Sequence, residues 1–271
     1  MTFCLLSVNW KVFGIVWGVF FVIALVFAIL ILIVSKICKL DEDKKVEAII
    51  ERLGGSNCGG CGCSGCAAFA KKLVSGEGDV HACHATTNQN AKEIAEILGI
   101  EYKEEEPVVA VVKCSGGLNA KNKYNFVGYT DCSTLSTTFQ GGPKVCPTGC
   151  IGGGECLSRC VHGAIQIKDN LSVIDRKLCV SCGACVQGCP KSLIELVPRS
   201  ATVYIACSSH CRGKDVMGVC DKGCIGCGLC AKNCPQGAIT MQDNLPIIDY
   251  TKCNGCKTCM AKCPRKIIRE M

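Results

Sequence analysis

The chain has 271 residues, of which 28 are cysteine, 30 glycine and only 8 proline, and its formal net charge is +7. An apolar fraction of 49% excludes a disordered tail. Aromatic and branched residues are sparse after the first forty positions, which excludes one conventional domain with a single large core. The composition therefore predicts several small modules that are cross-linked through cysteine.

An uncharged apolar segment of 23 residues runs from Val12 to Val34. As a helix rising ~1.5 Å per residue it spans roughly 34 Å, enough to cross a hydrocarbon core. A signal peptide is the alternative, but the segment is too long and no small-residue cleavage site follows it. Lysines are more frequent on its C-terminal side, which predicts a single-pass protein of the cell membrane with its remaining domains in the cytoplasm. Thiols stay reduced there, so metal ligation is favoured over disulfides.

Beyond this segment, the sequence predicts short helices and strands. Apolar spacing predicts helices over residues 41–53, 67–74 and 91–98, and composition predicts a buried strand over residues 108–112. A polar run ending at Pro107 marks a domain boundary. We expect an α+β protein in four parts: an N-terminal segment with a transmembrane helix (1–40), a four-cysteine domain (41–100), a linker, strand and first cysteine-rich module (101–200), and a second module (201–271).

The second half contains an internal repeat with an offset of 74 residues and no gap. Eight cysteines recur at this offset: Cys146, Cys150, Cys156, Cys160, Cys179, Cys182, Cys185 and Cys189 match Cys220, Cys224, Cys230, Cys234, Cys253, Cys256, Cys259 and Cys263. Each copy contains two short strand segments, at residues 165–167 and 173–174 in the first. Segments of this length do not form an independent hairpin, so each module needs a cross-link.

Three runs have the spacing C-x2-C-x2-C-x3-C-P, at residues 179–190, 224–235 and 253–264. This is the spacing of bacterial [4Fe–4S] ferredoxins, in which three thiolates bind one cluster and the fourth binds the other cluster of the pair. Zinc prefers two separated cysteine pairs with a longer spacer. The runs therefore favour iron–sulfur clusters over zinc.

Crossed ligation predicts the ligands of each cluster. In the second module, one set is Cys224, Cys227, Cys230 and Cys263, and the other is Cys253, Cys256, Cys259 and Cys234. In the first module, Cys179, Cys182, Cys185 and Cys160 form one set. The partner set keeps Cys150, Cys156 and Cys189 but has Gly153 where the repeat has Cys227. Cys146 is the nearest candidate for the missing ligand, with Cys132 and Cys114 as alternatives.

A further cluster is predicted in the four-cysteine domain, with Cys58, Cys61, Cys66 and Cys83 as ligands. Glycines around these cysteines let the backbone wrap closely about a cluster. Cys63 is an extra thiol in this loop, either unligated or a member of a set that differs by one residue.

In total we expect about five [4Fe–4S] clusters, a number uncertain by one cluster. The cysteines without an assigned role beyond the first forty residues are Cys63, Cys114, Cys132, Cys207, Cys211 and Cys220. Cys114 and Cys207 lie at matching strand ends, as buried thiols or as ligands.

The predicted clusters alter the net charge of the protein and therefore the classes of function that are expected. An oxidised cluster with four thiolates carries about −2, so five clusters lower the net charge from +7 to about −3. A nucleic-acid partner is therefore not expected. The sequence has no G-x-G-x-x-G before a helix and no G-x4-G-K-[ST], and it contains no constellation for acid–base or nucleophilic catalysis. We expect an electron relay whose substrate chemistry belongs to partner subunits.

From Gly54 to the C-terminus, behind an apolar N-terminal segment, the chain resembles the B subunit of the Rnf complex. The resemblance depends on Cys58, Cys61, Cys66 and Cys83 (NCGGCG-x2-GC) and on GGPKVCPTGCIGGGEC, residues 141–156, which is similar to the family's modified first ferredoxin run. On this resemblance Gly153 is a family feature, which favours Cys146 as the substitute ligand. The tandem modules look like the longer, anaerobe-type version of the subunit.

The resemblance implies a subunit of a membrane-bound, Na⁺- or H⁺-translocating ferredoxin–NAD⁺ oxidoreductase. Its partners would be soluble reduced ferredoxin as the electron donor and the other subunits of the complex. The four-cysteine domain would lie near the membrane, and the distal modules would meet the donor. Three alternatives remain open: a polyferredoxin subunit of another anaerobic membrane reductase or hydrogenase-like complex, a membrane-tethered zinc or assembly scaffold, and a redox sensor that uses the spare thiols.

Overall fold

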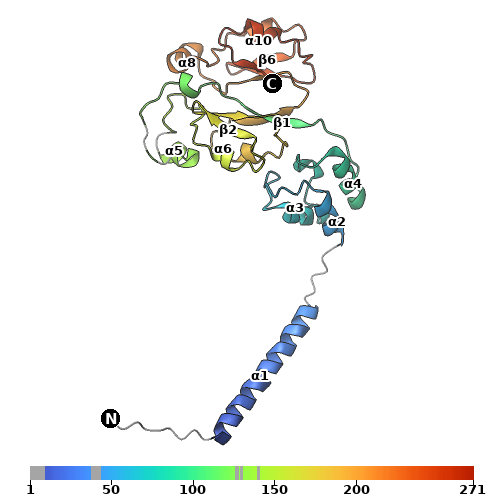
Figure 1. The fold of residues 1–271 in the computed structure, drawn as a ribbon. Helices are drawn as coiled ribbons and strands as arrows, with labels where there is room; N and C mark the ends of the chain where they lie inside the picture. The colour runs from blue at the N-terminus through green and yellow to red at the C-terminus, as the bar shows by residue number, and fades with distance from the viewer. Residues whose placement is uncertain (1–9, 38–43, 126–127, 129–130, 139–140) are drawn as a thin grey trace, which may run out of the picture. The chain divides into compact units, whose positions relative to one another are not determined.

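The computed structural model describes residues 10–37, 44–125, 128, 131–138 and 141–271. It divides into two units, Met1–Lys44 and Lys45–Met271. The described residues of the first unit include the helix α1 (Trp10–Ile37), which covers the predicted helical segment (Figure 1). Among the residues that the structure describes, no helix has the length and apolarity that crossing a membrane requires. The helix is thus confirmed as a helix, and its function as a membrane span stays a prediction.

The second unit begins with a small helical domain around the first cysteine group. Its elements are α2 (Lys44–Arg52), α3 (Cys66–Val74), the 3-10 helix η1 (Val80–Ala82) and α4 (Asn88–Leu98). The three predicted helices are present, although residues 41–43 of the first lie outside the described residues. Their apolar faces meet in one core that includes the fully buried side chains of Ile49 and Ile94. Cys61, Cys66 and Cys83 pack against this core.

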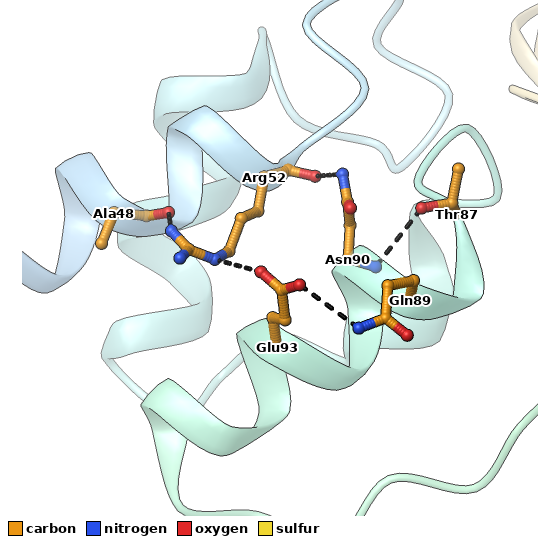
Figure 2. Close-up of polar contacts among 6 residues, drawn as sticks. All are labelled: Ala48, Arg52, Thr87, Gln89, Asn90 and Glu93. Atoms are coloured by element: carbon orange, nitrogen blue, oxygen red, sulfur yellow. Dashed lines mark hydrogen bonds and ion pairs between the residues drawn. The ribbon is translucent and has the colours of Figure 1, made fainter.

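Polar contacts fix α2 against α4 (Figure 2). The Arg52 guanidinium forms a 2.8 Å ion pair with Glu93 and donates a hydrogen bond to the Ala48 carbonyl. The Asn90 side chain donates to the Arg52 carbonyl at 2.9 Å. Thr87 caps α4, because its hydroxyl accepts a hydrogen bond from the Asn90 amide. These contacts hold both helices beside the loop that carries the cysteines.

Each ferredoxin-type module is built from two antiparallel pairs of strands (Figure 1). In the first module, β1 (Val108–Val112) pairs with β4 (Ile194–Pro198), and β2 (Ile165–Lys168) pairs with β3 (Leu171–Ile174). In the second module, β5 (Val203–Ile205) pairs with β8 (Ile268–Glu270), and β6 (Ile239–Gln242) pairs with β7 (Leu245–Ile248). The predicted strands at residues 108–112, 165–167 and 173–174 are therefore confirmed. In both modules the first strand pairs with the last, around a central hairpin.

The two hairpins turn in the same way. Asp169 and Asn170 both have positive φ, at 53° and 57°, and so do Asp243 and Asn244, at 44° and 66°. Two consecutive residues of positive φ are the requirement of a type I′ turn, which Asp and Asn tolerate better than most residues. The sequence repeat is therefore a repeat of backbone conformation as well as of cysteines.

Short helices fill the segments between the cysteines. They are η2 (Gly117–Asn119), α5 (Cys132–Thr138), α6 (Glu155–Ser158), α7 (Ala184–Gln187), α8 (Gly213–Val219), α9 (Leu229–Lys232) and α10 (Thr258–Lys262). The core of each module combines strand residues such as Ile165 and Ile239 with the cysteines themselves. Cysteine therefore occupies interior positions that aliphatic residues fill in an ordinary domain.

A connecting segment at residues 119–123 belongs to the first module in sequence and bonds to both. Its Lys121 amide donates to the Val219 carbonyl at 2.9 Å, and the Asp221 amide donates to the Asn119 carbonyl at 3.0 Å. On the other side, the Val145 amide donates to the Lys121 carbonyl at 2.9 Å. The segment thereby brings residues 143–145 and 219–221 to either side of one strand-like stretch.

Candidate metal centres

The second module brings together the two cysteine sets that crossed ligation predicts. Burial raises the pKa of Cys259 to about 11, with further contributions from the charges of Cys253, Cys234 and Cys256. The other set, Cys224, Cys227, Cys230 and Cys263, lines a cavity of about 20 Å³. The last cysteine of each run thus lies with the other run, as it does in a two-cluster ferredoxin.

The first module repeats this arrangement for one of its sets. Cys160, Cys179, Cys182 and Cys185 line a cavity of about 20 Å³. Burial raises the pKa of Cys185 to about 12, with the charges of the neighbouring thiolates as the next causes. A thiol with this pKa is protonated at neutral pH in the metal-free chain, so metal binding must release its proton.

In the structure, Cys132 is the cysteine that lies with the other three members of the partner set of the first module. Cys132, Cys150, Cys156 and Cys189 line one cavity of about 20 Å³. Burial raises the pKa of Cys132, while hydrogen bonds from the backbone of Glu155 and Gly153 lower it. The Cys132 thiol therefore lies at Gly153, the position where the repeat lacks a cysteine.

A carboxylate explains how Cys132 reaches this place. Cys132 is the first residue of α5, and Glu155 is the first residue of α6. Glu155 accepts hydrogen bonds from the Ser133 amide at 3.0 Å and from the Ser133 hydroxyl at 2.6 Å. This contact ties the start of α5 to the residue that precedes Cys156.

Cys146 does not line the cavity of this set. It lines a different cavity together with Cys114, Cys207 and Cys220, and Cys150 is the member of the set that lines both. The expectation that Cys146 replaces the ligand missing at Gly153 therefore differs from the structure, which places Cys132 there. The physical reason is that Cys146 bends away in a tight turn, in which the Gly149 amide donates to the Cys146 carbonyl at 3.1 Å. Linear distance from Cys150 was a poor guide to position.

In the four-cysteine domain, the structure groups only some of the predicted ligands with one another. Burial raises the pKa of Cys61, whose charged neighbours are Cys63 and Cys83. Cys83 accepts a hydrogen bond from the Thr86 hydroxyl at 3.2 Å. Cys58 lies beside Cys182 of the first module, where burial raises the pKa of Cys182 and the charge of Cys58 raises it further. Cys63 is thus grouped with two of the predicted ligands, and the ligand set of this domain stays a prediction.

The surroundings fit large anionic clusters. Gly152 and its repeat equivalent Gly226 have positive φ, and an added Cβ would meet the hairpin residues Asn170 and Asn244 at 2.8 Å and 3.0 Å. The cysteine loops therefore pass directly over the hairpin turns.

In the described residues, no three Cys, His, Asp or Glu side chains converge as they do on a single metal ion. Tetrahedral zinc would draw its sulfurs to roughly 3.8 Å of each other, given a Zn–S bond of about 2.3 Å, whereas a four-iron cluster spreads its ligands over four irons.

Three family models match the chain. The model described as "Putative Fe-S cluster" matches residues 53–84, and models described as "4Fe-4S dicluster domain" match residues 149–194 and 223–267. The matches cover the four-cysteine loop and both sets of repeated runs. The prediction of [4Fe–4S] clusters is confirmed at the level of the domain type.

Curated relatives extend the similarity along the chain. The chain is 39% identical over 238 residues to the B subunit of the Na⁺-translocating ferredoxin:NAD⁺ oxidoreductase complex of Acetobacterium woodii, covering 87% of this chain and 71% of the relative. It is 37% identical over 241 residues to the B subunit of the ion-translocating oxidoreductase complex of Methanosarcina acetivorans, covering 88% and 91%. The B subunit of the proton-translocating ferredoxin:NAD⁺ oxidoreductase complex of Clostridium ljungdahlii is 36% identical over 243 residues, covering 88% and 85%. At these identities and coverages the chain belongs to the family of Rnf-type B subunits, the electron-transfer subunits of ion-translocating oxidoreductase complexes.

Proposed function

We propose that this chain accepts electrons from reduced ferredoxin and relays them through its [4Fe–4S] clusters to membrane partners that complete NAD⁺ reduction. The observation that carries the proposal is the crossed grouping of the thiols. Cys234 lies with Cys253, Cys256 and Cys259, and Cys160 lies with Cys179, Cys182 and Cys185. Paired clusters that share two cysteine runs are the architecture of a one-electron carrier.

The clusters supply reversible one-electron oxidation and reduction, and the residues of this chain provide the rest. Burial in the module cores keeps water away from ligands such as Cys185 and Cys230. Backbone amides stabilise charge on the sulfurs; for example, the Leu193 amide donates to Cys189 at 3.4 Å. Hydrogen bonds to sulfur and solvent exposure are the means by which a protein sets the potential of a cluster.

We assign five sets of ligands, with Cys132 in place of Cys146. They are Cys58, Cys61, Cys66 and Cys83; Cys132, Cys150, Cys156 and Cys189; Cys160, Cys179, Cys182 and Cys185; Cys224, Cys227, Cys230 and Cys263; and Cys234, Cys253, Cys256 and Cys259. These sets fall within the division into residues 41–100, 101–200 and 201–271. The first set rests on its spacing and on the family model that matches residues 53–84.

We place the chain at the cell membrane through its N-terminal segment, with the cluster domains on the cytoplasmic side. The support is the uncharged sequence from Val12 to Val34 within α1 and the excess of lysine after it. Carbonate extraction of membranes tests the anchor, and protease treatment of inverted and right-side-out vesicles tests the orientation. Release of the intact chain by carbonate would overturn this assignment.

Reduction of the purified full-length holoprotein by ferredoxin tests the function. Reduced ferredoxin is mixed with the chain without oxygen, and bleaching of its visible absorption is followed by stopped flow. We expect about one electron to be taken up per cluster. A chain that carries its clusters but is not reduced by ferredoxin, while dithionite reduces it, would contradict the proposed donor.

A further inference from the structure

Five cysteines outside the three matched family models line one cavity between the two ferredoxin-type modules, and the matches cover only residues 53–84, 149–194 and 223–267. Cys211 is exposed, and the other four, Cys114, Cys146, Cys207 and Cys220, are buried or half-buried. The cavity has a volume of about 60 Å³, compared with about 20 Å³ at each of the three cavities lined by the ferredoxin-type sets. There is thus at least as much room here as at the sites where the sequence pattern predicts clusters.

The four sulfurs are neighbours. Burial raises the pKa of Cys220, and the charges of Cys114, Cys146 and Cys207 raise it further. The same neighbours, Cys114 and Cys146, act on Cys207. A Cβ added to Gly116 would lie 3.4 Å from the Cys114 sulfur and 3.9 Å from the Cys220 sulfur, so both sulfurs flank one residue. Four thiols crowded in a buried space would repel one another once ionised, unless cations lie between them.

Each module contributes an equivalent pair. Cys146 and Cys220 are 74 positions apart and share the local sequence C-x2-G-C. Both turns close in the same way, because the Gly223 amide donates to the Cys220 carbonyl at 3.3 Å just as Gly149 does to Cys146. Cys114 and Cys207 each lie two residues beyond the end of a strand, β1 or β5. The four-thiol group is therefore built by the repeat itself.

The backbone holds the two halves of this group together. The connecting segment forms an isolated antiparallel bridge between Ala120 and Cys220. Ser208, next to Cys207, donates its hydroxyl to the Lys113 carbonyl at 2.9 Å, next to Cys114. The pairs are thus fixed across the module junction by direct bonds between residues adjacent to the cysteines.

A buried cation marks the same place. Lys144 is only 4% exposed, and its ammonium group donates to the carbonyl oxygens of Gly117 at 2.7 Å and Ala120 at 3.5 Å. Both acceptors line the cavity. Within the described part of the chain, no carboxylate forms an ion pair with Lys144. Burying an ammonium group without a counter-charge is costly, and a cluster with four thiolates would supply a net charge of about −2.

The sulfurs also receive hydrogen bonds from the ligand residues of both modules. The Cys150 amide donates to the Cys114 sulfur at 3.5 Å, and the Cys224 amide donates to the Cys207 sulfur at 3.3 Å. Cys150 and Cys224 are equivalent in the repeat and each belongs to a proposed cluster set of its own module. The four-thiol group is therefore hydrogen-bonded to one proposed ligand residue of each module.

We propose that Cys114, Cys146, Cys207 and Cys220 bind a further [4Fe–4S] cluster that connects the two ferredoxin-type modules. This rests on the proposed function, since it adds a member to the same electron relay. Assembly would take up two ferrous ions, two ferric ions and four sulfide ions, and would release the protons of the four thiols. Held by these four cysteines, the cluster would take one electron from a reduced cluster of one module, which would return to its oxidised state, and would pass that electron to the other module.

Cluster counting on the full-length holoprotein, purified and loaded without oxygen, tests this site. Native mass spectrometry resolves clusters as discrete mass increments, and iron and sulfide are quantified in parallel. We expect six clusters and about 24 irons per chain. A maximum of five clusters in a fully loaded chain, or zinc in place of the sixth cluster, would overturn the proposal.

Single replacements then locate the cluster. Cys220→Ala and Cys146→Ala should each lose about four irons and the same signal in a potentiometric EPR titration. Cys132→Ala should lose a different signal. The matched control is Cys211→Ala, because Cys211 also lines the cavity but is exposed and outside the set, and it should keep all six clusters. Full iron in Cys220→Ala would overturn the site.

A variant that loses most of its clusters has failed to fold, and the cluster count of the unmodified chain then decides alone. The result also stands apart from the proposed function. Ferredoxin would still reduce a chain with five clusters and no junction cluster, which would refute only the inference. A chain with six clusters that ferredoxin cannot reduce would refute only the donor.

Discussion

Gln187 donates a hydrogen bond from its side-chain nitrogen to the backbone carbonyl of Gly60, at 2.8 Å. Gly60 belongs to the four-cysteine loop and Gln187 to α7 of the first module. An added Cβ at Gly60 would lie 1.6 Å from the carbonyl oxygen of Cys182. The contact therefore lays the four-cysteine loop directly on the loop of the ferredoxin-type module that contains Cys182.

Gly60→Ala should detach this loop, because a Cβ cannot occupy the space of the Cys182 carbonyl. We expect faster hydrogen exchange at residues 59–62 and 182–184 and faster proteolysis in the polar linker at residues 101–107. The matched control is Gly218→Ala, since an added Cβ at Gly218 meets nothing within 4 Å. Equal exchange in both variants would show that the docking contact is absent in solution.

The apolar core, rather than the ion pair, should stabilise the four-cysteine domain. Ile94 is fully buried, so Ile94→Ala should cost about 2–5 kcal/mol of the free energy of unfolding. Glu93→Gln removes the ion pair with Arg52, whose side chain is 34% exposed and screened by solvent, and should cost under about 1 kcal/mol. Thermal unfolding of the loaded chain, followed by iron release, measures both. If Glu93→Gln destabilised the domain more than Ile94→Ala, the ion pair would contribute more to stability than the apolar core, contrary to this prediction.

Substitutions in the hairpin turn of the second module should lower the stability of that module. Asn244 has a φ of 66° and donates its side-chain amide to the His210 carbonyl at 3.1 Å. Asn244→Gly keeps the backbone conformation and loses the hydrogen bond, at a cost of about 1 kcal/mol. Asn244→Ala should cost about 1–2 kcal/mol more, because it adds the left-handed strain.

The melting temperature of the loaded protein checks this series. Asn170 at the equivalent turn of the first module provides the comparison, and Asn170→Gly and Asn170→Ala should show the same strain difference. Identical melting temperatures for the Gly and Ala variants at both turns would refute the strain argument.

Glu155 should control the cluster that Cys132 completes. Glu155→Gln weakens the two bonds to Ser133, which hold the start of α5, by about 1–3 kcal/mol for a charged acceptor. We expect partial loss of the same EPR signal that Cys132→Ala removes completely, with the signals of the second module unchanged. Glu101→Gln, in the exposed linker, is the control. A full signal in Glu155→Gln would show that α5 is positioned by other contacts.

The sequence was most informative where spacing alone determines structure. The offset of 74 residues predicted two equivalent modules, and the same spacing predicted which runs meet, because a C-x2-C-x2-C loop can bind only one cluster. Helix periodicity predicted α3 and α4 closely, since their buried residues recur on one face. These features are local, and the chain encodes them over short distances.

The position of Cys132 was not predictable from spacing, because it depends on the contact between Ser133 and Glu155, 22 residues apart. The grouping of Cys114 with Cys207 was not predictable from spacing either, although the sequence places both at matching strand ends. Their meeting depends on the pairing of β1 with β4 and on the bridge at Ala120, which are long-range. A signal was present in the recurrence of Cys146 as Cys220, which places the two cysteines at equivalent positions of the repeat.

The bonds from Lys121 and Asn119 to residues 219–221 have a consequence for biogenesis. A ribosome releases residue 121 long before it has made Val219, so the stretch waits without its partner during translation. All four strands of the first module, β1 to β4, precede Val219 in the chain, so the first module can pair its strands while this side of the stretch is still unpaired. The junction can form only after residues 219–221 have emerged, so its bonds form later in synthesis than the strand pairs of the first module.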